Sequence, residues 1–328
     1  MDLKLLEYTL RELGEPRYRD RQVWKWAAQG AACFSAMTDL PLSLRQTLSE
    51  RVPFSTLAPQ REDHARDGTV KALLRTTDGR PVEAVLMRYR DGRASMCLSS
   101  QSGCPLTCRF CATGQMRFGR NLTASEILDQ ALALRRAAGG AVNHAVFMGM
   151  GEPMLNLDQV LEACERLPQL GVTHRRTAIS TVGWIPGIER LAGEPIPIRL
   201  ALSLHAAEDA LRSELMPVNE RYPVADVLAA CRDYYERKRR RVFIEYVMLA
   251  GVNDSHAQAG QLARALDRQA FKVNLIPYNP TGSAYAGSSR KAIAAFKLEL
   301  ERHGITATVR LTRGREIDAA CGQLAARS

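Results

Sequence analysis

The sequence predicts an α/β fold in which six β/α units form a barrel or an open sheet. After residue 95, short apolar runs of strand length alternate with longer segments of helical periodicity. The apolar runs are nearly continuous, which is typical of parallel strands covered by helices. Polar or unusual residues gather directly after these runs. Because ligands bind at the carboxyl ends of such strands, we expect the functional site there.

Six runs have the composition of these strands, and one more lies near the end of the chain. They are Ser95–Ser99, Ala145–Met150, Thr177–Thr181, Ile198–His205, Val242–Leu249 and Val273–Pro277, followed by Thr306–Thr312. A capping box from Thr123 to Glu126 predicts the start of the helix after the first strand, and Ile127 and Ala131 continue its apolar face.

Two regions of different pattern precede the β/α units. Residues 1–60 contain three apolar helical stripes and a run, Arg17–Trp26, in which basic residues alternate with aromatic ones. Because such a run suits contact with RNA phosphates and bases, we expect a helical accessory domain that contacts RNA. Residues 61–94 contain short β-rich runs between Asp67-Gly68, Asp78-Gly79 and Asp91-Gly92 turns, which predict an antiparallel β extension. We therefore divide the chain into 1–60, 61–94, 95–305 and 306–328, the last being a C-terminal strand and tail.

The composition indicates a cytoplasmic protein with a polyanionic partner. The 328 residues have a formal net charge of +10, and a basic surface attracts phosphate groups, which favours RNA. No membrane-spanning run is visible, and the first residues lack the pattern of a secretory signal. Of the eight cysteines, Cys33, Cys164 and Cys231 sit alone in helical patterns, so we expect them to be buried or incidental and expect no secreted disulfide framework.

The stretch from Cys97 to Arg120 carries the most specific motif. Cys104, Cys108 and Cys111 form C-x₃-C-x₂-C, so that three thiolates can converge on one metal centre. A closed zinc site almost always takes four protein ligands, whereas an iron–sulfur cubane held by three cysteines leaves one iron open for a non-protein ligand. The alternative interpretation is a zinc knuckle or a redox-sensing loop whose fourth ligand lies elsewhere.

With the Phe110-Cys111 pair and Cys97, this spacing resembles the radical S-adenosylmethionine (SAM) superfamily, and more narrowly the RlmN/Cfr family of RNA adenine C2 methyltransferases. The run from Arg313 to Leu324 closely resembles the C-terminal segment in which that family methylates a cysteine, here Cys321. The resemblance implies a partial (β/α)6 radical SAM barrel. It also implies a [4Fe–4S] cluster held by the three clustered cysteines and two molecules of SAM per turnover.

The resemblance further implies a set of SAM-binding residues. The segment Gly149–Pro153 is similar to the superfamily's motif for the SAM amino group; Gly151 would let the backbone approach the ligand, and Glu152 would accept hydrogen bonds from an ammonium or ribose group. The other matching positions are Ser180, Ser203, His205 and Asn279. Taken singly, each is alternatively a satisfied polar group at a strand end.

Three residues are implied to carry the chemistry. C2 of adenine is an electron-poor carbon that cannot attack a sulfonium as a base nitrogen does, so direct methyl transfer is excluded. In the implied route, Cys321 takes a methyl group from one SAM, and a radical made from a second SAM activates that methyl group for addition to C2. Cys97 then attacks the Cys321 sulfur, which forms a disulfide and releases the RNA, while Glu83 accepts the C2 proton. A lone carboxylate such as Glu83 is alternatively a surface or salt-bridged residue.

The implied substrates are 23S rRNA at the peptidyl transferase centre and tRNA next to the anticodon. An electron donor such as flavodoxin or ferredoxin and a monomeric state are also expected. The nearest alternative is the same chemistry at adenosine C8, which confers antibiotic resistance, and a zinc-stabilised RNA-binding protein without catalysis is an alternative from another class.

Four basic segments are candidates for RNA contact: Arg17–Trp26, Arg117–Arg120, His174–Arg176 and Arg237–Arg241. In the first of them, the tryptophans are alternatively core residues and the arginines solvated ones.

Overall fold

A computed structural model describes residues 1–325 of the chain. Its α-helices are α1 (Leu3–Glu12), α2 (Tyr18–Ala28), α3 (Leu42–Arg51), α4 (Ala124–Ala138), α5 (Leu157–Arg166), α6 (Ile185–Gly193), α7 (Asp209–Leu215), α8 (Val224–Lys238), α9 (His256–Ala265) and α10 (Arg290–Arg302). Its strands are β1 (Leu57–His64), β2 (Val70–Thr76), β3 (Pro81–Arg88), β4 (Ala94–Cys97), β5 (Gln101–Ser102), β6 (Arg120–Asn121), β7 (His144–Phe147), β8 (Thr177–Thr181), β9 (Arg199–Ser203), β10 (Val242–Met248), β11 (Phe271–Pro277) and β12 (Ala307–Val309). Short 3₁₀ helices are η1 (Phe34–Ala36), η2 (Thr113–Gln115), η3 (Pro153–Asn156), η4 (Leu167–Leu170), η5 (His174–Arg176), η6 (Pro217–Glu220) and η7 (Arg315–Ile317).

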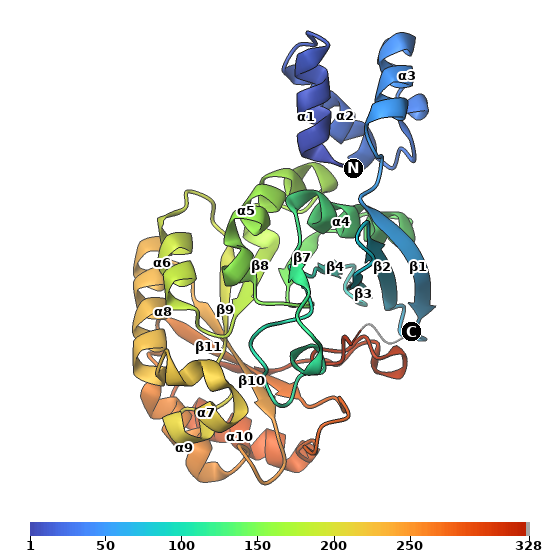
Figure 1. The fold of residues 1–328 in the computed structure, drawn as a ribbon. Helices are drawn as coiled ribbons and strands as arrows, with labels where there is room; N and C mark the ends of the chain where they lie inside the picture. Colours follow the sequence, from blue (N-terminus) through green and yellow to red (C-terminus); the bar gives the residue numbers. More distant parts are fainter. Residues whose placement is uncertain (326–328) are drawn as a thin grey trace.

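One continuous sheet organises the main body. Its strand order is β1-β2-β3-β4-β7-β8-β9-β10-β11-β12. The first four strands are antiparallel neighbours, and from β4 onward every neighbouring pair is parallel. Helices cover the outer side of the parallel part (Figure 1). The predicted α/β class with a partial β/α barrel is therefore confirmed, and each of the seven predicted strands overlaps an observed one.

The antiparallel part contains one strand that the sequence patterns do not predict. The Asp-Gly turns lie between β2, β3 and β4 or just before β2, and Gly68, Gly79 and Gly92 each have a φ of +81°, which favours glycine. Strand β1, in contrast, is an edge strand that buries almost only Leu57. Its polar sequence lacks the apolar alternation that marks a half-buried strand, which is why it was missed.

Helices α1–α3 form a lobe that projects from the main body (Figure 1). The lobe is joined to the body by buried polar contacts: the Met1 amino group pairs with Asp129 of α4, and Leu3 N donates to Ser125 Oγ over 3.0 Å. Trp24 is fully buried and donates its ring N–H to the Arg166 carbonyl of α5. Lobe and body therefore share one hydrophobic core.

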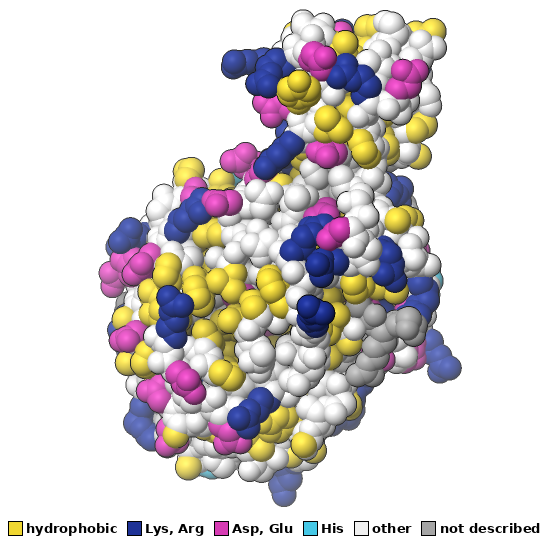
Figure 2. Space-filling view, in the orientation of Figure 1, with side chains coloured by type: hydrophobic (Ala, Val, Ile, Leu, Met, Phe, Trp, Pro, Cys, Tyr) yellow, Lys and Arg dark blue, Asp and Glu magenta, His cyan; other side chains and the backbone are white. Residues whose placement is uncertain are grey.

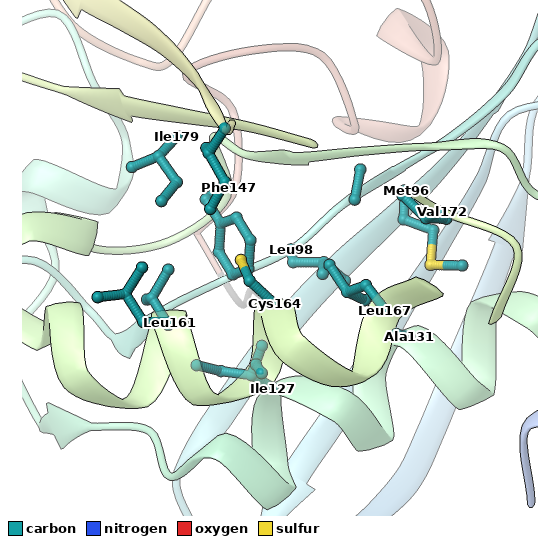
Figure 3. Close-up of a cluster of buried hydrophobic side chains, with 14 of the residues drawn as sticks. Met96, Leu98, Ile127, Ala131, Phe147, Leu161, Cys164, Leu167, Val172 and Ile179 are labelled. Carbon is teal, nitrogen blue, oxygen red and sulfur yellow. The ribbon is translucent and has the colours of Figure 1, made fainter. Parts of the chain in front are cut away.

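Helices α4 and α5 pack their apolar faces on β4, β7 and β8. Figure 3 shows Ile127 and Ala131 of α4 and Leu161 and Cys164 of α5 in the same cluster of buried side chains as Phe147 of β7. The predicted capping box is confirmed, because the Thr123 hydroxyl accepts from Glu126 N and the Glu126 carboxylate accepts from Thr123 N. Helices α4 and α5 therefore bury the outer face of these strands.

None of the helices in residues 1–325 combines the length and the apolar character that a membrane span requires.

Candidate active site

A cavity at the carboxyl ends of the parallel strands gathers most of the predicted site residues. Those that line it are Cys97, Cys104, Cys108, Cys111, Gly151, Glu152, Ser180, Ser203, His205 and Cys321. Glu83 and Asn279 are adjacent to the C-terminal tail but do not line the cavity. The cavity therefore brings together residues that span more than two hundred positions of the sequence, as expected for the carboxyl ends of parallel strands.

The three clustered cysteines lie on one loop, residues 103–119, which we call the cysteine loop. It is folded tightly: a Cβ on Gly103 would lie 2.6 Å from Arg117 O, and one on Gly114 would lie 2.8 Å from Cys108 O. Burial raises the pKa of the Cys104 thiol to about 12 and that of Cys108 well above its usual range, and neighbouring thiols add to both shifts. The three thiols are therefore close enough to interact and would be deprotonated by binding a metal centre.

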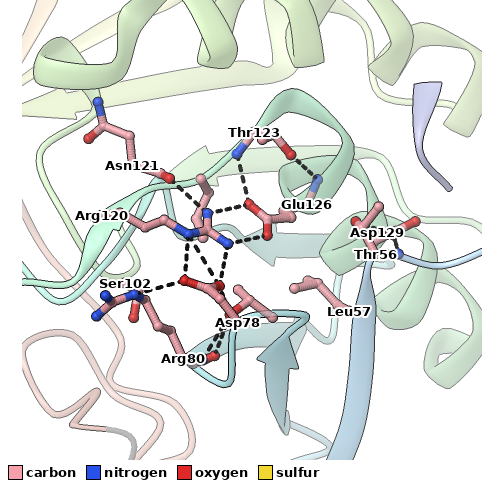
Figure 4. A network of polar contacts seen from close by, with 12 residues as sticks. Thr56, Leu57, Asp78, Arg80, Ser102, Arg120, Asn121, Thr123, Glu126 and Asp129 are labelled. Atoms are coloured by element: carbon pink, nitrogen blue, oxygen red, sulfur yellow. Dashed lines mark hydrogen bonds and ion pairs between the residues drawn. The ribbon is translucent and has the colours of Figure 1, made fainter. Parts of the chain in front are cut away.

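A guanidinium clamp closes the end of the cysteine loop (Figure 4). Arg120 pairs with Asp78 in the β2–β3 turn and with Glu126 in the first turn of α4, both at 2.7 Å. Arg80 adds a contact of 3.0 Å to Asp78. One arginine therefore ties the loop to the antiparallel strands and to a barrel helix.

The segment Gly149–Pro153 follows β7 and places Glu152 in the cavity wall. Its carboxylate accepts from Met154 N and Val182 N, both over 3.0 Å, and burial raises its pKa to about 7. The two glycines serve the chain itself, because a Cβ on Gly149 would lie 2.6 Å from Ser99 Oγ and one on Gly151 would lie 2.5 Å from Gln101 Cβ. The close approach of Gly149 to Ser99 and of Gly151 to Gln101 is therefore enough to require glycine at both positions.

Ser180 near the end of β8, Ser203 at the end of β9 and His205 just after β9 line the same cavity. The two serine hydroxyls are 3.2 Å apart. His205 Nδ1 accepts from Val247 N over 3.0 Å, so the neutral ring carries its proton on Nε2, and burial lowers its pKa to about 3. The ring of Phe110 packs edge-on against this imidazole, with centroids 4.8 Å apart. The cysteine loop is thereby held against the end of β9.

Cys321 enters the cavity on the C-terminal tail, residues 310–325. Cys321 is open to the cavity and Cys97 is buried in its wall; burial raises the pKa of both thiols, that of Cys97 to about 12. Each of the eight cysteines in residues 1–325 is free, so the disulfide implied for Cys97 and Cys321 is not present. The two thiols nevertheless line one cavity.

The tail is docked by hydrogen bonds to several elements. Ala112 N donates to Gly322 O over 2.8 Å, and the Thr113 hydroxyl donates to Leu324 O over 2.6 Å. Asn279 Nδ2 donates to Cys321 O over 3.2 Å, and Ala325 N donates to Glu83 Oε2 over 2.9 Å. The tail therefore contacts the cysteine loop, the end of β11 and the antiparallel strands at once.

Three charged residues were not predicted from the sequence: Arg310 and Glu245 in the cavity, and Lys71 beside Glu83. Arg310 and Glu245 line the cavity 3.8 Å apart; burial disfavours the Arg310 charge, but Cys321 and Glu245 outweigh it and raise the pKa of Arg310. Lys71 of β2 is buried and pairs with Glu83. A charged residue inside an otherwise apolar strand, as in Val70–Leu74, is the sequence signal that marks such positions.

The basic segments proposed for RNA contact differ in their placement. Trp24 is a core residue and Arg120 is fully engaged in the clamp. The segments His174–Arg176 and Arg237–Arg241 precede β8 and β10, at the amino ends of the strands, opposite the cavity. Arg117, on the cysteine loop, is exposed.

The residues present fit a cluster and a SAM molecule. Among residues 1–325, no group of three His, Cys, Asp or Glu side chains converges on a single metal ion, but a cubane asks for less convergence because each cysteine binds a different iron. Within the same part of the chain, the buried Asn279 Oδ1 has no hydrogen-bond partner and remains available to accept from a bound group. Glu152 offers a carboxylate to an ammonium group.

Two family models match the chain. The model described as the Radical SAM superfamily matches residues 98–262, and the one described as the ribosomal RNA large subunit methyltransferase N-terminal domain matches residues 1–53. The first match contains the cysteine loop, and the second contains the helical lobe.

Full-length relatives and a solved structure agree with these matches. A protein of Chloroflexus aurantiacus named "Probable dual-specificity RNA methyltransferase RlmN" is 49% identical, over 98% of this chain and 93% of its own length. A protein of the same name from Thermus thermophilus is 44% identical, over 98% of this chain and 92% of its own length. The crystal structure of a radical SAM methyltransferase from Sphaerobacter thermophilus has 46% identity and a TM-score of 0.94, and the alignment covers 100% of this chain and 98% of that chain.

Proposed function

Because the chain belongs to the RlmN family of dual-specificity RNA methyltransferases within the radical SAM superfamily, we propose that it methylates C2 of adenosine in two RNAs. It is a SAM-dependent RNA methyltransferase that uses a [4Fe–4S] cluster and SAM. The proposed targets are 23S rRNA at the peptidyl transferase centre and tRNA next to the anticodon.

The observation that carries this proposal is the meeting of the cysteine loop with Cys97 and Cys321 in one cavity. We assign Cys104, Cys108 and Cys111 as ligands of the cluster. Glu152, Ser180, Ser203, His205 and Asn279 are assigned to SAM, with Gly151 shaping the turn beside them. A tail that brings Cys321 beside the cysteine loop is expected if a protein thiol takes part in the chemistry.

The bound cluster and SAM would supply an electrophilic methyl group and a radical that abstracts hydrogen. Cys321 is proposed to accept the methyl group on its sulfur and to carry it to C2 of the adenine, which joins RNA and protein. Cys97 then attacks the Cys321 sulfur: the bond from that sulfur to carbon breaks, and a transient Cys97–Cys321 disulfide forms. Glu83 is proposed to accept the C2 proton. Two molecules of SAM are used in each turnover.

The proposal also includes the electron donor, the oligomeric state and the residues that contact RNA. A one-electron donor such as flavodoxin or ferredoxin would reduce the cluster, and the enzyme would act as a cytoplasmic monomer. For RNA phosphates we favour Arg117 and Arg109, which are exposed on the cysteine loop at the cavity, over the basic segments at the opposite ends of the strands.

Product analysis tests the proposed function. The reconstituted enzyme is incubated with SAM, a reductant, and rRNA or tRNA that lacks the modification, and the nucleosides are analysed by mass spectrometry. A methyl group on adenosine C2 in both RNAs is expected. A methyl group on C8 would support the alternative regiochemistry, and a methyl group on a base nitrogen would contradict the proposal.

A further inference from the structure

The antiparallel strands place a row of three charged side chains across one face of the sheet. Asp63 of β1 is directly opposite Lys71 of β2. Lys71 is opposite Val85 of β3, and Leu73 is opposite Glu83, so Lys71 and Glu83 are diagonal neighbours on the same face. The Lys71 Nζ lies 3.3 Å from Glu83 Oε1 and 3.8 Å from Asp63 Oδ2.

The same face carries the site of the proposed chemistry. Val85 is opposite Cys97 of β4, so Glu83, Val85 and Cys97 face the same side of the sheet. Ala319 and Leu324 of the tail pack against Val85 and Cys97. The C-terminal tail therefore lies over the part of the sheet that presents Glu83, Lys71 and Cys97.

Lys71 and Glu83 form an ion pair whose two side chains are both buried. The side chain of Lys71 is 7% exposed and that of Glu83 is 1% exposed. A carboxylate taken out of water is strongly destabilised in its ionised form unless a cation compensates its charge. Lys71 therefore supplies a cation directly beside a carboxylate that has little access to water.

The two oxygens of Glu83 have different neighbours. Oε1 faces Lys71, whereas Oε2 accepts from the backbone N–H of Ala325 in the docked tail, over 2.9 Å. Oε2 is thus the oxygen on the side of the tail, and the tail is the element that carries Cys321. A group delivered together with Cys321 would meet Oε2 rather than Oε1.

We propose that Lys71 is the positioning residue for Glu83, holding Oε1 and balancing its charge so that Oε2 accepts the proton from adenine C2. This rests on the proposed function, in which Glu83 is the proton acceptor. In the step itself, the C2–H bond breaks, its electron pair stays with the purine ring, and the proton forms a bond to Oε2. In the docked tail the Ala325 N–H already donates to Oε2, so we expect residue 325 to move aside as adenine C2 approaches this oxygen.

A purely structural ion pair would stabilise the fold but would not act at one stage of the reaction. The experiment therefore resolves the stages in the full-length, cluster-loaded enzyme. Methylation of Cys321 is measured by protein mass spectrometry before RNA is added, the covalent protein–RNA adduct is measured on denaturing gels, and released methylated RNA is measured by nucleoside analysis.

We expect Lys71→Met to methylate Cys321 to the wild-type extent but to release methylated RNA about 10- to 100-fold more slowly, with the adduct accumulating. Lys71→Arg retains the cation and is expected to restore most of the release. The double variant Lys71→Met, Glu83→Gln should be no slower than Glu83→Gln alone, because Lys71 acts through Glu83. The control is Lys272→Met, a half-buried strand lysine over the ring of Phe243 at the start of β11, which should change neither stage.

Two results would overturn the proposal. One is release at the wild-type rate from Lys71→Met. The other is an equal loss of Cys321 methylation and of release, which is the signature of a structural role. If Lys71→Met does not fold, the comparison of the double variant with Glu83→Gln decides, and a double variant about tenfold slower than Glu83→Gln would contradict the proposal. Failure of the proposed function is a separate result, since wild-type enzyme would then methylate RNA without ever carrying a methyl group on Cys321.

Discussion

Burial controls the charge state of the individual side chains in the cavity. It raises the pKa of Glu152 to about 7 and lowers that of His205 to about 3, so near neutral pH the carboxyl group titrates while the imidazole stays neutral. Burial also raises the pKa values of the thiols of Cys97 and Cys321, which disfavours thiolates until a partner or a metal stabilises them. We therefore expect Glu152 and the thiols to lose their protons when a cationic ligand or a metal binds in the cavity.

For Glu152, we expect the affinity of the cluster-loaded protein for SAM to rise about tenfold between pH 6 and pH 8. Below a pKa of about 7 the side chain is neutral and cannot pair with an ammonium group, and above it the carboxylate can. The stability of the protein without SAM depends on pH in the opposite direction. Because the pKa of Glu152 is raised in the folded state, the free energy of unfolding decreases as the pH rises through 7. Isothermal titration of SAM into wild type and Glu152→Gln measures the effect, and the same pH profile in both proteins would contradict the assignment of Glu152.

For Cys97, we expect Cys97→Ala to accumulate RNA covalently bound to Cys321, because the alanine cannot attack the sulfur of the adduct. Denaturing gels of the reaction show the adduct as a protein band of reduced mobility that disappears on nuclease treatment. The control is Cys33→Ala, which removes an exposed thiol outside the cavity. Release of methylated RNA from Cys97→Ala at the wild-type rate would rule out the resolving role.

Individual site residues were predictable where a local motif marks them. The spacing of Cys104, Cys108 and Cys111 lies within one loop, so the sequence alone predicts that the three thiols meet. The contact of Lys71 with Glu83 follows only from the register of β2 and β3, and the approach of Arg310 to Glu245 follows only from the pairing of β11 with both β10 and β12. Such contacts depend on strand pairing, which a local pattern does not encode.

Among the elements, two segments without regular strands build the site at the ends of the parallel strands: the cysteine loop and the C-terminal tail. The Arg120 clamp fixes the cysteine loop to α4 and to the β2–β3 turn, and the C-terminal tail is hydrogen-bonded to the same loop at Ala112 and Thr113. The clamp is an ionic network in a partly buried place, whereas residues 319–325 of the tail are held by hydrogen bonds and by the packing of Ala319 and Leu324 against Val85 and Cys97. We therefore expect the end of the tail to open more readily than the clamped loop.

For the tail, we expect Thr113→Val to weaken docking by about 1 kcal/mol, because the change removes the hydroxyl that donates to Leu324 O and keeps the shape of the side chain. Hydrogen exchange of residues 319–325 should then be faster by about fivefold. Thr47→Val, on the exposed face of α3, serves as the control. Unchanged exchange in Thr113→Val would mean that other contacts hold the tail.

For the clamp, we expect Arg120→Met to lower the free energy of unfolding by about 2 kcal/mol, since Glu126, only 5% exposed, loses its cation. Arg80→Met removes a neighbouring arginine that contacts the same aspartate at the surface, and it should cost at most about 1 kcal/mol. Chemical denaturation of both variants measures the difference. Equal effects of the two changes would argue that the clamp is an ordinary surface network.

Helices and strands were predictable from the sequence where a local motif marks where they begin or end. The capping box fixes the start of α4, and the Asp-Gly turns fix the spacing of β2, β3 and β4. Strand β1 has no such signal, because an edge strand with mostly exposed residues can be polar throughout and is stabilised by its pairing with β2.

In the whole molecule, the hydrophobic core and the cavity occupy different places. The core runs continuously through the lobe and the main body, and the cavity lies at the carboxyl ends of the parallel strands. The lobe of α1–α3 shares the core of the main body, while the cavity, the cysteine loop and the tail all lie at the carboxyl ends. Figure 2 shows hydrophobic side chains over the middle of the main body, with Lys and Arg side chains distributed around them. RNA bound at this end would bring an adenine to the thiols without crossing the core.

The fold class was predictable because the alternation of strands and helices is repeated along the chain, so that single errors do not change the result. The return of the C-terminal tail to the antiparallel strands was not predictable from the sequence. It depends on segments that are distant in sequence and meet only in the folded chain.

The most direct measurement follows the methyl carbon through Cys321. Protein whose Cys321 carries a trideuterated methyl group is mixed with unlabelled SAM, a reductant and substrate RNA for a single turnover. Transfer by way of the cysteine predicts product adenosine with a methyl group that holds two deuterium atoms, because one is abstracted and replaced by hydrogen from the solvent. A methyl group without deuterium in the first turnover would contradict the account.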